Sequence, residues 1–63
     1  MCEANAYLLK EGGEEELIFE NVDRILPGED SLLMEDIFGK KKTLRARIKE
    51  MALVDHKILL ENL

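Results

Sequence analysis

Cys2 is the only cysteine of the 63-residue sequence, and its place beside the first amine makes it the first candidate for metal chemistry. With Met1 retained, the Met1 amine, the Cys2 amide nitrogen and the Cys2 thiolate close two fused five-membered chelate rings. With Met1 removed, the Cys2 amine and thiolate close one ring. Adjacent nitrogen and thiolate donors in a plane suit nickel(II) or copper(II), which accept square-planar geometry, better than zinc(II). The alternative for Cys2 is a buried or incidental thiol without a ligand role.

A single chain offers only two or three such donors, so the predicted metal site needs a second source of ligands. A two-fold dimer that brings both N-termini together would supply a second thiolate. Size argues in the same direction, because a chain this short buries only about 60% of the surface that its unfolded form exposes. Without an internal disulfide, it needs a metal or a partner subunit for stability. We therefore expect a homodimer that holds its metal through Met1 and Cys2.

His56 is the only histidine, and it lies between Asp55 and Lys57 in a predicted turn. In that position we interpret it as a solvated loop residue rather than a ligand. The sequence has no paired-cysteine motif and no cysteine–histidine spacing of the zinc type. Cys2 as nucleophile with His56 as base is conceivable, but no pattern brings the two together and so small a chain encloses little pocket. We expect a protein that is not an enzyme.

Six of the nine basic residues fall within ten positions, which makes a basic strip in a chain of net charge −5. If this segment is a strand, Arg45, Arg47 and Lys49 point to one face, which could hold phosphates. No aromatic residue is interleaved with the strip, so the stacking platform expected for single-stranded nucleic acid is missing. We favour a solvated face over a small RNA-binding protein as the interpretation. The strip consists of Lys40, Lys41, Lys42, Arg45, Arg47 and Lys49.

Short apolar segments separated by turn residues predict strands, although the abundant Leu, Glu and Lys favour helices by propensity alone. Residues 43–49 alternate polar and apolar at every step, and Gly39 just before them indicates a hairpin turn. The other candidate strands are 4–10, 15–20, 22–26, 31–37, 51–54 and 58–60. Six or seven short strands predict an all-β fold, a small antiparallel β-barrel, closed or nearly closed, in a single domain over residues 1–63. The competing interpretation is a helix over residues 43–63, where Leu44, Ile48 and Met51 share one face.

Composition limits the class of protein. Hydrophobic residues make up 46% of the chain and charged residues 37%, which is typical of a folded domain and not of a disordered one. No apolar run approaches the roughly 20 residues of a membrane span, and the first residues lack the basic and apolar regions of a signal peptide. A free thiol without an export signal predicts a cytoplasmic protein with no membrane partner.

The chain as a whole resembles the CooT family. The resemblance rests on the length, the opening Met1-Cys2-Glu3-Ala4, the early Tyr7-Leu8, the Val22-Asp23 segment, the turn at residues 36–39 and the final apolar strand. It implies a small β-barrel homodimer that binds nickel as an accessory protein for nickel insertion into carbon monoxide dehydrogenase. It also implies a nickel site at the dimer interface to which Cys2 of each chain contributes. The same family is labelled "predicted RNA-binding protein".

Together these features predict a dimeric nickel(II)-binding protein, a metallochaperone or nickel store with Cys2 and Met1 as metal residues. The expected partners are a second copy of the chain and a nickel enzyme such as carbon monoxide dehydrogenase or its maturation factors. The alternative function is RNA binding by the basic strip at residues 40–49, and we expect nucleic acid to bind weakly because the acidic remainder of the chain repels phosphate.

Overall fold

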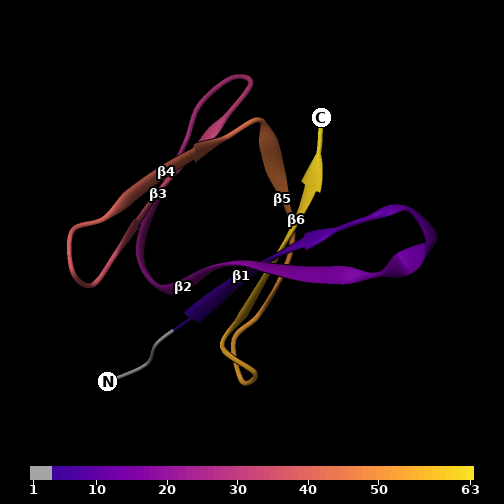
Figure 1. Ribbon diagram of the computed structural model, residues 1–63, viewed down its shortest axis with the longest axis horizontal. Coiled ribbons are helices and arrows are strands. Elements are labelled where there is room, and N and C mark those ends of the chain that lie inside the picture. The colour runs from indigo at the N-terminus through magenta and orange to yellow at the C-terminus, as the bar shows by residue number, and fades with distance from the viewer. Residues whose placement is uncertain (1–3) are drawn as a thin grey trace.

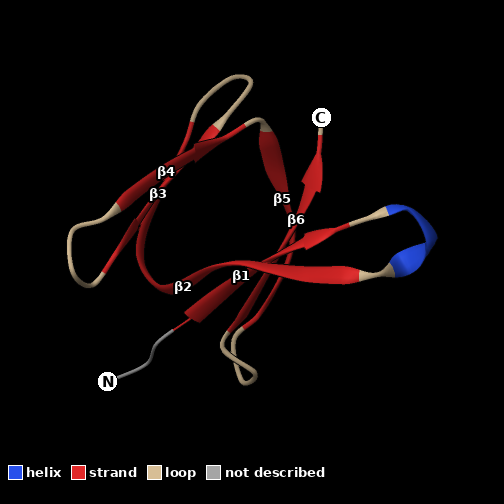
Figure 2. Cartoon of the chain, in the orientation of Figure 1, coloured by secondary structure: helices blue, strands red, loops and turns tan. Residues whose placement is uncertain are grey.

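Six β-strands joined by short turns account for most of residues 4–63, the part of the chain that the computed structural model describes (Figures 1 and 2). A short 3₁₀ turn at Glu11–Gly13 connects the first two strands. The strands are β1 (Ala4–Leu9), β2 (Glu15–Pro27), β3 (Leu32–Asp36), β4 (Lys41–Leu44), β5 (Ala46–Ala52) and β6 (Lys57–Asn62). The predicted all-β fold is confirmed, and the helix considered for residues 43–63 is wrong. Residues 4–63 contain no helix with the length and apolar character that crossing a membrane requires.

The strands form one sheet in the order β4-β3-β2-β1-β6-β5. Four of its neighbouring pairs are antiparallel, as expected of hairpins, but β1 and β6 run parallel. Hairpin signals in a sequence reveal only pairs of consecutive strands. The β1–β6 pair joins the two ends of the chain, so the antiparallel prediction does not hold for it.

The predicted barrel is not closed by hydrogen bonds. β4 and β5 are the two edges of the sheet, and only Arg45 separates them in the sequence. Two strands joined by one residue follow each other around a corner and cannot lie side by side in a ladder. The alternating segment at residues 43–49, which was expected to be one strand, therefore divides at Arg45.

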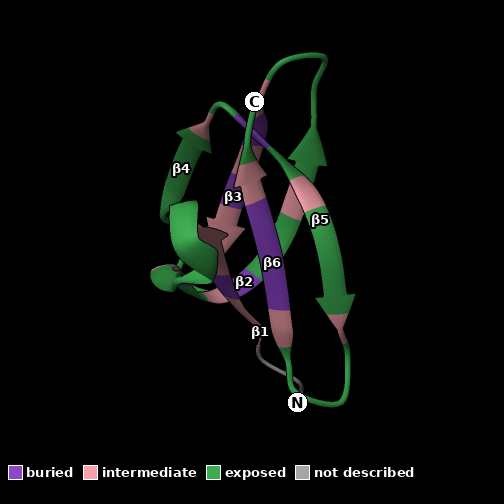
Figure 3. Cartoon of the chain, turned by 90° about the vertical axis from the view of Figure 1, so that its right-hand side faces the viewer, coloured by how far each residue is buried: buried purple, intermediate pink, exposed green. Residues whose placement is uncertain are grey.

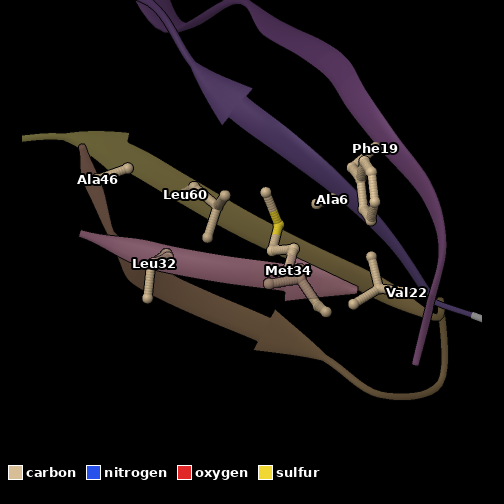
Figure 4. Packing of buried hydrophobic residues seen from close by; sticks show 8 residues of the cluster. Ala6, Phe19, Val22, Leu32, Met34, Ala46 and Leu60 are labelled. Carbon is tan, nitrogen blue, oxygen red and sulfur yellow. The ribbon is translucent and has the colours of Figure 1, made fainter. Parts of the chain in front are cut away.

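One face of the curled sheet carries the main core cluster, and Leu59 on β6 is buried outside that cluster. Ala6, Val22, Met34 and Leu60 are buried in the cluster together with Phe19 and further residues from β3, β5 and β6 (Figure 4). Figure 3 shows that burial concentrates on β6, whereas β4 and β5 are mostly exposed. The alternation of apolar and polar residues seen in the sequence thus separates a core face from a solvent face.

Candidate metal site at the start of the chain

The predicted metal donors, Met1 and Cys2, lie outside the described residues. Among residues 4–63, no three histidine, cysteine, aspartate or glutamate side chains gather as a metal-binding group. The structure does define the surroundings of Ala4 and Asn5, from which the first three residues extend. The residues around the start of β1 therefore determine where a metal held by the N-terminus would lie.

Three hydrogen bonds hold the start of β1 between two hairpins. The amide of Asn5 donates to the carbonyl oxygen of His56 at 2.9 Å, in the turn between β5 and β6. Oδ1 of Asn5 accepts from the amide of Asn21 at 3.2 Å. The carbonyl oxygen of Asn21 in turn accepts from the amide of Ile37 at 3.0 Å, in the turn between β3 and β4. Figure 1 shows the start of β1 between these two hairpins.

Asn21 bridges the two sides because β2 bulges at this point. The register passes from Ala6 opposite Phe19 to Ala4 opposite Val22, which leaves Glu20 and Asn21 facing Asn5 alone. Asn21 has φ of 55°, a left-handed conformation that asparagine tolerates better than most residues. The bulge also explains why the segments 15–20 and 22–26, predicted as separate strands, form one strand in the structure.

His56 is an exposed turn residue, as predicted, with a left-handed φ of 51°. Its carbonyl oxygen accepts from the amide of Asn5, however, a proximity that no sequence pattern indicated. The histidine therefore lies at the same end of the molecule as the start of β1. Sequence reasoning missed Asn5 and Asn21, which position the start of β1. The only signal for Asn5 was a polar side chain between two alanines, and Asn21 stood among other polar residues without any signal.

Both hairpins beside the chain start expose large apolar side chains. Leu53 and Val54, in the turn between β5 and β6, are 78% and 94% exposed; we call this pair the Val54 tip. Ile37 and Phe38, in the turn between β3 and β4, are 43% and 80% exposed; we call this pair the Phe38 tip. Solvent-exposed apolar side chains on two neighbouring turns are typical of interaction surfaces.

The basic strip lies on the two edges of the sheet. All six of its residues are exposed, and Leu44, Ala46 and Ile48, which alternate with the last three of them, are buried or half-buried. Unpaired edge strands invite pairing with other chains, and lysine on an edge is a common protection against it. This role accounts for a solvated strip without any ligand. The residues are Lys40 in the turn, Lys41 and Lys42 in β4, Arg45 at the corner, and Arg47 and Lys49 in β5.

Two lysine–glutamate pairs link the start of β2 to β6 and to the residue that follows β1. Lys57, directly across from Asn5 in the β1–β6 pair, contacts Glu15, and this hydrogen bond raises the pKa of Lys57. Lys10 Nζ lies 2.6 Å from Glu16 Oε1; their hydrogen bond raises the pKa of Lys10 and lowers the pKa of Glu16. Water reaches both pairs and screens them, so they are modest structural contacts.

Comparison with known proteins identifies the family of the chain. The family model for the CO dehydrogenase accessory protein CooT matches residues 1–61. A crystal structure assigned to CooT from Carboxydothermus hydrogenoformans shares 50% sequence identity and superimposes with a TM-score of 0.89, covering 98% of both chains. No significant match was found among curated proteins. The chain therefore belongs to the CooT family of CO dehydrogenase accessory proteins.

Proposed function

We propose that this protein is a non-catalytic, dimeric nickel(II) carrier that supplies or stores nickel for the maturation of carbon monoxide dehydrogenase. Family membership supports the accessory role. The chemistry of Cys2 supports nickel, because its thiolate is the only soft anionic donor of the chain and an adjacent main-chain nitrogen completes a chelate.

The observation that carries this proposal is the hydrogen bond between the Asn5 amide and the His56 carbonyl oxygen. It fixes the start of β1 next to the Val54 tip, an apolar surface that a second copy would cover. Cys2 lies three residues before Asn5, a reach of at most about 10 Å along an extended chain. Two copies that meet at their Val54 tips can therefore direct both thiolates to one ion.

The charges beside the Val54 tip suit contact between identical surfaces. In a two-fold interface each residue faces the same surface of the partner, so a surface of one sign repels itself. Asp55, in this turn, and Lys57, directly after it, carry opposite charges, and Lys57 also contacts Glu15 of its own chain. A two-fold contact here places side chains of both signs around an apolar centre, and it would add buried area to the small core of each chain.

Nickel bound in this way is cargo held by ligands that protons can displace. Both thiolates and the nitrogen donors must be deprotonated to bind the ion. Acid therefore weakens the site. The carrier would release nickel wherever a client offers a competing set of ligands.

A nickel(II) titration of protein with a verified N-terminus tests the proposal. We expect one nickel per dimer and a thiolate-to-nickel charge-transfer absorption, with affinity that falls as the pH is lowered. Cys2→Ser should abolish the absorption and the tight binding. His56→Asn is the control, since asparagine tolerates the left-handed backbone of this position while removing the imidazole. Normal binding by Cys2→Ser together with loss of binding in His56→Asn would place the metal on the hairpin instead.

A further inference from the structure

We propose that the Phe38 tip docks the carrier on its client enzyme, with Phe38 entering an apolar pocket rimmed by carboxylates. This inference rests on the accessory function proposed above and assigns the partner surface to a second site. It starts from the observation that a large aromatic side chain is held in solvent by a well-ordered turn.

The turn that carries Phe38 is fixed by hydrogen bonds to one aspartate. Oδ1 of Asp36 accepts from the amides of Phe38 at 2.9 Å and of Lys40 at 2.8 Å. The carbonyl oxygen of Asp36 accepts from the amide of Gly39 at 3.0 Å, and the Asp36 amide donates to the carbonyl oxygen of Lys40 at 2.9 Å. The Ile37 amide adds the contact to Asn21. A turn ordered in this way pays little conformational entropy on binding.

Phe38 has the properties of an anchor residue. It is 80% exposed and makes no part of the core cluster, so the fold does not require an aromatic side chain here. Burial of such a side chain in a partner's pocket is a common source of binding free energy in protein interfaces. Ile37, next to it and 43% exposed, extends the apolar centre of the contact.

The lysines that follow the tip define the chemistry of the partner. Lys40 and Lys41 are exposed, and none of the ion pairs formed among residues 4–63 involves them. Lys42 is exposed as well, but its Nζ points to the carbonyl oxygen of Ile18 on β2, at 3.5 Å. Lysines around an apolar anchor attract a rim of carboxylates and steer association.

The same charges argue against the other two occupants. A second copy would bring Lys40 and Lys41 against the same two lysines of the partner across a two-fold axis. Single-stranded RNA stacks successive bases on several aromatic rings, but Phe38 is the only aromatic residue at this tip. The adjoining hollow of about 320 Å³ also contains the acidic Glu20 and Asp36 beside Lys40. An acid-rimmed pocket on a partner protein fits the tip better than a second copy or single-stranded RNA does.

The test is the binding of the nickel-loaded protein to nickel-free carbon monoxide dehydrogenase from the same organism, measured by titration calorimetry. We expect Phe38→Ser to weaken binding about ten-fold or more. Leu26→Ser, a matched exposed apolar control on β2, should leave it unchanged. Lys41→Glu should weaken binding, and the loss of affinity should be larger at low salt. Lys49→Glu, the same change on the other edge strand, should have little effect.

Three outcomes would overturn the inference. Equal affinity of wild type and Phe38→Ser would show that the tip does not dock the enzyme. Conversion of the dimer to a monomer by Phe38→Ser would assign the tip to the second copy. Tight binding of labelled single-stranded RNA at about 150 mM salt, lost in Phe38→Ser, would assign it to nucleic acid. Phe38→Ser must also keep one nickel per dimer, and a wild type that docks without binding nickel would refute the carrier function and leave the docking site intact.

Discussion

One asparagine side chain and the main chain of two other residues hold the start of β1 in place. The side chain of Asn5 replaces a ladder hydrogen bond that the β2 bulge interrupts, whereas Asn21 and His56 contribute only their main chain. Short amides suit this role because they reach backbone groups nearby and tolerate left-handed conformations. The proposed metal site therefore depends on residues that need never touch the metal.

Residue burial also separates two methionines that the sequence does not distinguish. Met34 is fully buried in the core cluster, whereas Met51 is 55% exposed on β5. Met34→Ala should cost about 2–5 kcal/mol of the free energy of unfolding, because it leaves a cavity in the core. That is a large share of the total stability of so small a domain. Met51→Ala should change it by less than about 0.5 kcal/mol.

Urea unfolding followed by circular dichroism, at one protein concentration for all variants, measures both methionine effects. Equal midpoints for the two variants would mean that the core is not centred on Met34.

At the scale of elements, the turn between β3 and β4 depends on one glycine conformation. Gly39 has φ of 87°, and a Cβ there would meet no atom within 4 Å, so substitution costs only backbone strain. Gly39→Ala should lower stability by about 1–2 kcal/mol, and Gly39→Asn by less because asparagine tolerates this region. Gly28→Ala is the control: its φ is not left-handed and its Cβ would make an ordinary 3.4 Å contact with Ser31.

Thermal unfolding of the three glycine variants checks this order. If Gly28→Ala were as destabilising as Gly39→Ala, conformational strain would not be the cause. Because the turn orients Phe38, Gly39→Ala should also weaken docking on carbon monoxide dehydrogenase more than Gly28→Ala does.

The strands themselves were largely predictable, because alternation and turn residues are local signals. The arrangement of the strands was not. The break at Arg45 leaves the alternation of residues 43–49 intact, and the β1–β6 pair joins residues more than 50 positions apart. The bulge at Asn21 follows from register and not from composition. For the proposed site, Cys2 is a prediction from its type and position alone and lies outside the described residues, while Asn5 and the proximity of His56 required the fold.

Over the whole molecule, charge and apolar surface are distributed unevenly. The basic strip occupies the sheet edges, and all fourteen acidic residues lie outside residues 40–49. Four exposed apolar residues form the two tips, which lie on the turns beside the start of β1. This arrangement gives one end of the molecule both proposed contacts, the second copy at the Val54 tip and the client at the Phe38 tip. Nickel held between two chains would thus lie close to the surface that meets the client.

The assignment of the Val54 tip to the second copy makes the assembly itself testable. Val54 is 94% exposed in a turn, so Val54→Asp should leave the fold of each chain intact while placing two like charges across the two-fold contact. Sedimentation equilibrium should show a dimer for wild type and a 7.2 kDa monomer for the variant. The melting temperature of wild type should rise with protein concentration, because the second subunit binds only the folded chain, and with nickel, because only the folded dimer brings two thiolates to one ion.

For Val54→Asp we expect a melting temperature that is independent of concentration and nickel binding that is weaker and no longer one ion per two chains. Leu26→Asp makes the same kind of change at a residue of β2 that is 48% exposed and lies outside both tips. Its melting temperature should depend on protein concentration as in wild type, and it should bind one nickel per two chains. If the Val54→Asp protein remains dimeric, the dimer interface lies elsewhere than at the Val54 tip. If that dimer still bound one nickel through both Cys2 thiolates, the shared site would stand without the Val54 tip, because thiolate coordination requires only that the two N-termini meet.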